Sequence, residues 1–161
     1  MSRSKGFTLV ELMVVLAILA IVAFIAVPNF TTLVRDNRVE AQAEELNALF
    51  QYARSEAVIR KIDTFVVLAP DSGDITIISG SVNGDVLRTS NLNPATLSLV
   101  ASDTTVGYRF NGTTTVPNFR AVLCADDNTA SGRVLTISAG GTTSLHNKGK
   151  NADGSDLGSC S

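Results

Sequence analysis

The hydrophobic pattern of the chain changes twice, and each change predicts a different element. Every residue from Leu12 to Val27 is apolar. With Phe7 to Glu11 ahead of it, this stretch would rise about 32 Å as a helix, which is enough to span a bilayer. The first part of the pattern therefore predicts a membrane segment.

The second part of the pattern, from Asn29 to Arg60, has the period of an amphipathic helix. Its apolar residues recur at spacings of three and four: Leu46, Leu49, Phe50, Ala53 and Ala57. The stretch from Arg35 to Glu45 has few large apolar residues, so we expect it to cross solvent. Pro28 lacks an amide hydrogen and its ring opposes the preceding turn, which predicts a kink there. Together these patterns predict one long, bent helix from about Phe7 to about Arg60.

After Lys61 the period becomes two and β-branched residues dominate. Strands are predicted at Thr64–Leu68, Ile75–Ser79, Val86–Thr89, Leu97–Ala101, Val106–Phe110, Phe119–Cys124, Val134–Ser138 and Thr143–His146. Because the connections are short, we expect antiparallel hairpins. The apolar residues at 106, 108 and 110, and at 135 and 137, should pack on the helical stripe. The predicted fold class is α+β, with a long helix packed on an antiparallel sheet.

Two cysteines, Cys124 and Cys160, lie far apart in the chain. This placement suits a disulfide bridge that holds a polar tail better than a metal site or a redox C-x-x-C pair. Such a bridge forms in an oxidising compartment, and closing the loop would contribute about 4 kcal/mol on the chain-entropy model. We therefore expect the segment from Asn147 to Ser161 to be a loop held by Cys160.

The topology follows from the ends of the apolar run. The alanines of the run recur every third residue, and Pro28 follows the run. The run therefore lacks the A-x-A cleavage pattern of a secretory signal and should remain part of the mature protein. Arg3 and Lys5 would keep the N-terminus cytoplasmic, which places the remainder in the periplasm. The net charge of −2 has no block of like charge and indicates no particular partner.

One carboxylate, Glu11, interrupts the front of the apolar run. Placing it in lipid costs about 2.5–3.5 kcal/mol, so it normally has a partner or a function. A cut between Gly6 and Phe7 would create an α-amino cation four residues before Glu11. This cation could pair with Glu11 of the same helix or of a neighbouring one. The alternative is that Glu11 lies at headgroup depth and is solvated.

The residues K-G-F-T-L-V-E-L-M-V-V-L-A-I, followed by Pro28-Asn29-Phe30, resemble the class III signal of type IV pilins and type II secretion pseudopilins. The resemblance implies that a prepilin peptidase cleaves after Gly6 and methylates the amine of Phe7. It also implies that Glu11 neutralises the amine of an adjacent subunit during assembly. The predicted segments are then a leader (1–6), a transmembrane and assembly helix (7–34), an amphipathic helix (35–60) and a β-rich head (61–161).

Two further stretches are similar to the GspH/FimT group of minor pilins and pseudopilins: Phe50 to Val58, and Val122 to Asp127 leading into Gly132 to Ile137. Pro28-Asn29-Phe30 favours minor pilins of the FimU/FimT kind. The implied function is a structural minor pilin. It would wait in the inner membrane, join the initiation or tip complex of a type IV pilus and contact other pilins at the cell surface, where the pilus could serve twitching motility.

Two alternatives stay open: a DNA-binding minor pilin of a competence pilus, and a minor pseudopilin of a type II secretion system. Some FimT-like members bind DNA through a G-R-x-R motif, but the expected position reads Gly140-Gly141-Thr142-Thr143. Gly132-Arg133 lacks the second arginine, and Lys148 and Lys150 are too few for a phosphate-binding groove. DNA binding is therefore the less favoured reading.

Metal binding and catalysis have little support in the sequence. Asp126, Asp127, Asp153 and Asp156 could donate oxygens to calcium, but the glutamate of an EF-hand is missing and solvated turns are the simpler reading. His146 is the only histidine and lies in no recognisable catalytic motif, so we expect it at the surface or at a strand end. We expect neither an enzyme, nor a cofactor, nor a small-molecule substrate.

Overall fold

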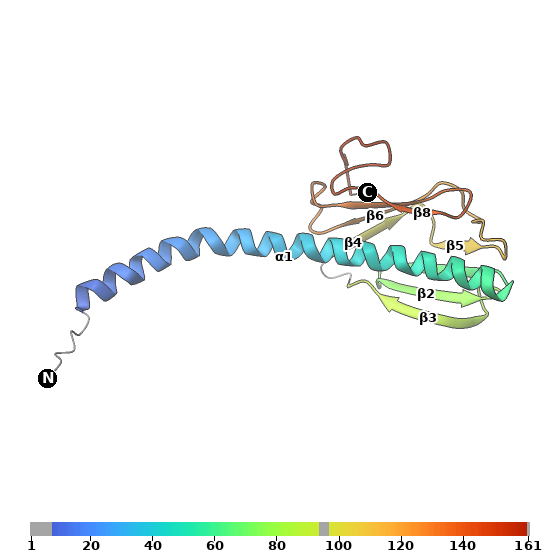
Figure 1. Ribbon diagram of the computed structural model, residues 1–161, viewed down its shortest axis with the longest axis horizontal. Coiled ribbons are helices and arrows are strands. Elements are labelled where there is room, and N and C mark those ends of the chain that lie inside the picture. The colour runs from blue at the N-terminus through green and yellow to red at the C-terminus, as the bar shows by residue number, and fades with distance from the viewer. Residues whose placement is uncertain (1–7, 94–96, 161) are drawn as a thin grey trace. The chain divides into compact units, whose positions relative to one another are not determined.

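The computed structural model describes residues 8–93 and 97–160. These residues group into two units, one ending at Arg35 and the other beginning at Asp36. The helix α1 runs from Leu9 to Arg60 without interruption (Figure 1). It ends because Lys61 adopts a left-handed conformation, with φ of 58°, which stops the helical repeat. The predicted helix is confirmed, while a kink at Pro28 stays a prediction.

The second unit contains two antiparallel sheets of four strands each. The first has the order β3-β2-β1-β5 and consists of β1 (Thr64–Ala69), β2 (Asp74–Ser79), β3 (Asp85–Asn91) and β5 (Thr105–Tyr108). The second has the order β4-β6-β7-β8 and consists of β4 (Ser98–Ala101), β6 (Phe119–Cys124), β7 (Arg133–Ile137) and β8 (Thr143–Leu145). In the view of Figure 1, β2 and β3 lie on one side of α1 and β4, β6 and β8 on the other.

One hydrophobic core joins the helix to both sheets. The helix contributes Val39, Ala43, Leu46, Leu49, Phe50, Ala53 and Ala57, all buried. The first sheet contributes Val66, Leu68, Ile75, Ile77, Val106 and Tyr108, and the second contributes Leu99, Phe119, Ala121, Leu123, Leu135 and Ile137. The rings of Phe50 and Phe119 pack at a centroid distance of 5.3 Å. The second half of α1 is therefore a structural part of the head.

The strand β6 is covered on both of its faces. Phe119, Ala121 and Leu123 face the helix, whereas Val122 and Cys124 belong to a second, smaller cluster. That cluster is completed by Val134 of β7 and by Leu157 and Cys160 of the C-terminal segment. The C-terminal loop thus covers the outer face of the second sheet.

The eight predicted strands are all present, and α+β is confirmed as the fold class. Two expectations were wrong. The stretch from Arg35 to Glu45 does not merely cross solvent, because Val39 and Ala43 are fully buried in the head. Phe110 does not continue the apolar face of β5: the strand ends at Tyr108, the chain turns, and Phe110 is 55% exposed. Its amide donates to a carboxylate oxygen of Asp63 at 2.9 Å, which holds the turn in place.

Candidate assembly segment and head surfaces

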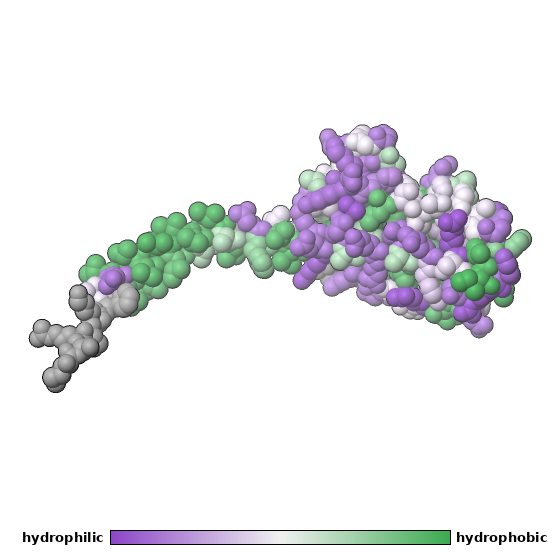
Figure 2. Space-filling view, viewed as in Figure 1, coloured by the Kyte–Doolittle hydropathy of each residue, from purple (hydrophilic) through white to green (hydrophobic). Residues whose placement is uncertain are grey.

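The first unit exposes an almost continuous apolar surface. Its large hydrophobic side chains from Leu9 to Leu33 are all solvent-accessible, and Phe24 is the most exposed at 84%. Figure 2 shows this hydrophobic surface along the first part of α1. The helix is long and apolar enough to cross a membrane by length and composition. An exposed apolar surface of this extent is typical of a membrane or protein–protein interaction site.

Glu11 has a local role that the sequence reading missed. Its backbone amide donates to the side-chain oxygen of Thr8 at 3.2 Å, so Thr8 is the N-cap of α1. Thr8 and Glu11 have the T-x-x-E spacing of a capping box. A carboxylate at position 11 is also stabilised by the positive end of the helix dipole. A test of charge pairing by Glu11 must therefore be separated from an effect on helix capping.

The predicted cleavage site lies between Gly6 and Phe7. Gly6 and Phe7 lie outside the described residues, so cleavage between them stays a prediction. Next to Pro28, the side-chain amide of Asn29 donates to the carbonyl oxygen of Ile25 at 3.0 Å. Pro28 leaves the carbonyl of Phe24 without its helical donor, and the Asn29 bond goes to the following residue instead.

The predicted bridge between Cys124 and Cys160 is confirmed, with an S–S distance of 2.02 Å. Gly132 is needed beside it, since a β-carbon there would lie 2.9 Å from the Cys124 sulfur and 2.6 Å from a methyl carbon of Leu157. The bridge and Leu157 together hold the loop after β8 against the sheet.

The basic residues that we considered for DNA each pair with a carboxylate. Nη2 of Arg133 lies 3.1 Å from Oε1 of Glu40. Nζ of Lys148 lies 2.6 Å from Oδ2 of Asp36, and Nζ of Lys150 lies 2.6 Å from Oδ1 of Asp156. These pairings reduce the positive charge that is available to attract a phosphate backbone.

The candidate calcium ligands are dispersed on the surface. Asp126 and Asp127 lie in a turn after β6 with φ of 49° and 53°. Asp153 accepts hydrogen bonds from the hydroxyl and the amide of Ser155, which lower the pKa of its carboxyl. Within residues 8–93 and 97–160, His, Cys, Asp and Glu side chains form no group of three that could hold a metal ion.

His146 directly follows β8, as expected for a residue at a strand end. One of its ring nitrogens, Nε2, lies 2.8 Å from the hydroxyl of Thr136 on β7. This contact gives it a structural role in the pairing of β7 with β8.

Arg54 joins the two sheets, a role that its sequence position did not reveal. Its Nε donates to the carbonyl oxygen of Gly112 in the β5–β6 loop, and its Nη2 donates to that of Gly140 in the β7–β8 loop, both at 3.0 Å. Sequence separations of 58 and 86 residues explain why no local pattern predicts these bonds.

Sequence comparisons identify two matching family models. The model of the type II transport protein GspH matches residues 42–141, and the model of the prokaryotic N-terminal methylation motif matches residues 1–27. A fimbrial protein of Pseudomonas aeruginosa is 33% identical over 109 residues, covering 63% of this chain and 70% of that protein. The type IV major pilin PilA of Myxococcus xanthus is 42% identical over 53 residues, covering 33% of this chain and 24% of that protein.

Solved structures support the same relationship. The type IV minor pilin FimU of Pseudomonas aeruginosa superposes with a TM-score of 0.65 at 30% identity, covering 78% of this chain and 96% of that one. The minor pseudopilin EpsH of the Vibrio cholerae type II secretion system superposes with a TM-score of 0.55 at 14% identity, covering 68% of this chain and 96% of that one. EpsH therefore indicates a shared fold only.

Proposed function

The chain belongs to the GspH family and carries the prokaryotic N-terminal methylation motif, and from this premise we propose that it is a minor pilin of a type IV pilus. A prepilin peptidase would remove the leader after Gly6 and methylate the new terminus at Phe7. The processed subunit would wait in the inner membrane with its head in the periplasm. From there its apolar helix would move into the initiation or tip complex of the fibre.

The observation that carries this proposal is the combination of a methylation motif with an apolar helix that continues into a folded head. The methylation motif covers residues 1–27, and the exposed apolar side chains in the first part of α1 run from Leu9 to Leu33. Such a surface fits lipid before assembly and neighbouring helices afterwards, because both are apolar environments that leave the helical hydrogen bonds intact. The likeness to FimU at 30% identity favours a pilus over a secretion pseudopilus.

The processing step is tested by mass spectrometry of the mature protein from its own cell. We expect a chain that begins at Phe7 and carries one added methyl group. A Gly6→Val variant should keep the leader and stay in the membrane fraction. A mature wild-type chain that still contains residues 1–6 would contradict the proposed cleavage.

The assembly step is tested by recovery of the protein in fibres sheared from the cell surface. Glu11→Gln removes the charge and keeps a residue that can serve in a capping box, whereas Glu11→Ala removes both. We expect both variants to disappear from the fibre fraction while their heads stay folded. Glu44→Gln is the matched control, because Glu44 is an exposed glutamate of the same helix within the head.

Incorporation of Glu11→Gln at the wild-type level would end the charge-pairing proposal, and loss of Glu11→Ala alone would indicate a role in helix capping. Deletion of the gene distinguishes the two kinds of fibre. Loss of surface pili with normal protein secretion supports a minor pilin, and the reverse supports a minor pseudopilin.

A further inference from the structure

The strand β8 has a free edge whose backbone groups point away from β7. The amide of Ser138 donates to the carbonyl of Thr142, and the amide of His146 donates to the carbonyl of Val134. Because hydrogen-bonded pairs alternate in an antiparallel ladder, the backbone groups of Thr143 and Leu145 face outward. No strand in the described part of the chain pairs with that edge.

The free edge is short but has no side chain that blocks strand pairing. Exposed edges are commonly kept very short, or carry a lysine, a proline, a bulge or an inward-pointing charge. The three residues of β8 are Thr143, Ser144 and Leu145, which include neither a charge nor a proline. Shortness is therefore the one protective device that β8 shows, and its side chains leave the backbone groups of Thr143 and Leu145 open to another extended chain.

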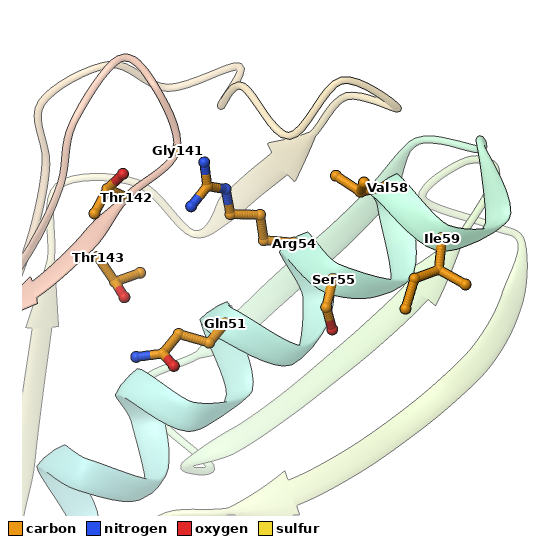
Figure 3. A pocket seen from close by; sticks show the side chains of 8 residues that line it. All are labelled: Gln51, Arg54, Ser55, Val58, Ile59, Gly141, Thr142 and Thr143. Carbon is orange, nitrogen blue, oxygen red and sulfur yellow. The ribbon is translucent and has the colours of Figure 1, made fainter.

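A groove of about 450 Å³ lies beside this edge and continues to the helix (Figure 3). Thr142 and Thr143 form one wall, and Gln51, Ser55 and Ile59 line the groove from α1 at intervals of four residues. These three helical side chains are exposed because the second sheet stops at β8. A strand added beside β8 would extend the sheet over them.

The groove carries a positive charge, and its described lining residues include no carboxylate. Arg54 lines it, and the hydrogen bonds of its guanidinium to Gly112 and Gly140 go to neutral carbonyls. No acidic side chain is among the eight residues that line the groove. By contrast, Arg133, Lys148 and Lys150 elsewhere on the head have carboxylate partners. An acidic group on the occupant would complete the site.

The groove also opens onto an exposed apolar patch at the end of α1. Val58 and Ile59 line the groove, and Ile62 and Phe110 extend the patch, with Ile59 the most exposed at 74%. A β-carbon on Gly112 would lie 3.1 Å from a methyl carbon of Val58. The amide of Phe110 donates to the carboxylate of Asp63, which follows Ile62 in the chain. The β5–β6 loop therefore lies beside the end of α1. Figure 2 shows hydrophobic surface over this end of the head.

We propose that the free edge of β8 binds an extended segment of another protein, which adds to the second sheet as a fifth strand and places a carboxylate beside Arg54. Backbone hydrogen bonds to Thr143 and Leu145 would supply affinity, as in other cases of strand addition. Specificity would come from the acidic side chain and from an apolar side chain over Val58 and Ile59. This inference does not depend on whether the fibre is a pilus or a secretion pseudopilus.

The probes for this proposal are overlapping peptides of about ten residues, the length of a long strand. They cover the other pilin-family proteins of the producing cell and, as a separate set, this chain itself. Binding is measured by fluorescence anisotropy on the full-length protein in detergent micelles, and amide hydrogen exchange is followed for Thr143 and Leu145. We expect an acidic peptide from another protein to bind and to slow exchange at both amides.

Peptide variants test the mode of binding without altering the protein. Backbone N-methylation at the residues that face β8 should weaken binding about tenfold, because each methyl group removes one interstrand donor. N-methylation at the intervening residues is the matched control and should have a smaller effect. Replacing the acidic residue by glutamine should weaken binding about fivefold at low salt.

Two protein variants then locate the site. Ser55 is an exposed groove residue, so Ser55→Glu should repel the acidic peptide and Ser55→Lys should retain or strengthen its binding. Equal N-methylation effects at both sets of positions, or unchanged exchange at Thr143 and Leu145 with every peptide, would overturn the proposal. Preferred binding of a peptide from this chain would also overturn it, in favour of contact between two copies.

Discussion

A β-carbon on Gly141 would lie 2.1 Å from the carbonyl oxygen of Gly112, so the β5–β6 and β7–β8 loops are in contact at these two glycines. Gly141 has φ of +78° and is buried, and a β-carbon there would also lie 3.3 Å from Nε of Arg54. This contact, together with the hydrogen bonds of Arg54, closes the two sheets around the end of the helix.

Gly141→Ala should destabilise the head more than an ordinary glycine replacement. The left-handed conformation costs about 1–2 kcal/mol with a side chain, and the clash with a backbone oxygen adds about 1–3 kcal/mol. Gly154→Ala is the matched control, because Gly154 has φ of +83° but nothing within 4 Å of the added carbon. Thermal unfolding followed by tyrosine fluorescence reports on the head, since Tyr52 and Tyr108 are the two tyrosines. Equal midpoints for the two variants would contradict the contact.

Removing the disulfide should release the C-terminal loop. Replacing Cys124 and Cys160 together by alanine is expected to lower the free energy of unfolding by up to about 4 kcal/mol for a sequence separation of 36 residues. Lys148 and Lys150 should then become sensitive to trypsin, because the loop that contains them loses its anchor. The oxidised wild-type protein, treated in the same way, is the control. Unchanged proteolysis would mean that Leu157 and the salt bridges hold the loop by themselves.

The carboxyl of Asp74 should make the folded head less stable as the pH falls. The hydroxyl of Ser72 and the side-chain amide of Asn91 donate to its carboxylate, both at 2.7 Å, and they lower its pKa below the usual range. A carboxyl whose pKa is lower in the folded state stabilises that state above the unfolded pKa of about 3.9. This contribution is lost as the pH falls through the folded pKa.

The measurement is a titration of the Asp74 carboxyl carbon by NMR. Ser72→Ala should raise the pKa of Asp74 towards its usual value, whereas Ser81→Ala, in the next turn, should leave it unchanged. An identical titration curve in wild type and Ser72→Ala would show that the hydroxyl does not favour the carboxylate in solution.

The hydroxyl of Tyr108 should contribute nothing to stability. It is buried without a hydrogen-bond partner in the described part of the protein, and burial raises the pKa of Tyr108 far above its usual value. Tyr108→Phe should therefore be neutral or should stabilise the head by about 1 kcal/mol, because no unpaired polar group is then buried. Chemical denaturation of the two proteins measures the difference. A loss above about 1 kcal/mol would indicate a hydrogen bond to water.

The local pattern predicted the elements better than their arrangement. The helix and all eight strands follow from periods of three to four and of two, and the bridge follows from the placement of two cysteines. The division into two sheets does not follow, because it depends on pairings between strands that are distant in sequence, such as β1 with β5 and β4 with β6. Val39 and Ala43 were missed as core residues, since a single valine among polar residues gives no helical stripe.

The functional residues also divide into those that the sequence could predict and those that only the fold reveals. Glu11 stands out in the sequence because a charge among apolar residues is conspicuous, and the capping role of Thr8 could have been found from the T-x-x-E spacing. The groove beside β8 could not, because its walls come from residues 51–59 and 141–143, which only the fold brings together. Its chemistry rests on which backbone groups remain unpaired, and that is a property of the sheet topology.

The continuity of α1 has a mechanical consequence. The helix has no loop between Leu9 and Arg60, and its second half packs on both sheets through residues such as Phe50. Tension applied to residues 36–60 of α1 is therefore resisted inside the head by the packing of Phe50 against Phe119. The head would bear such a load through interlocked side chains of α1 and both sheets.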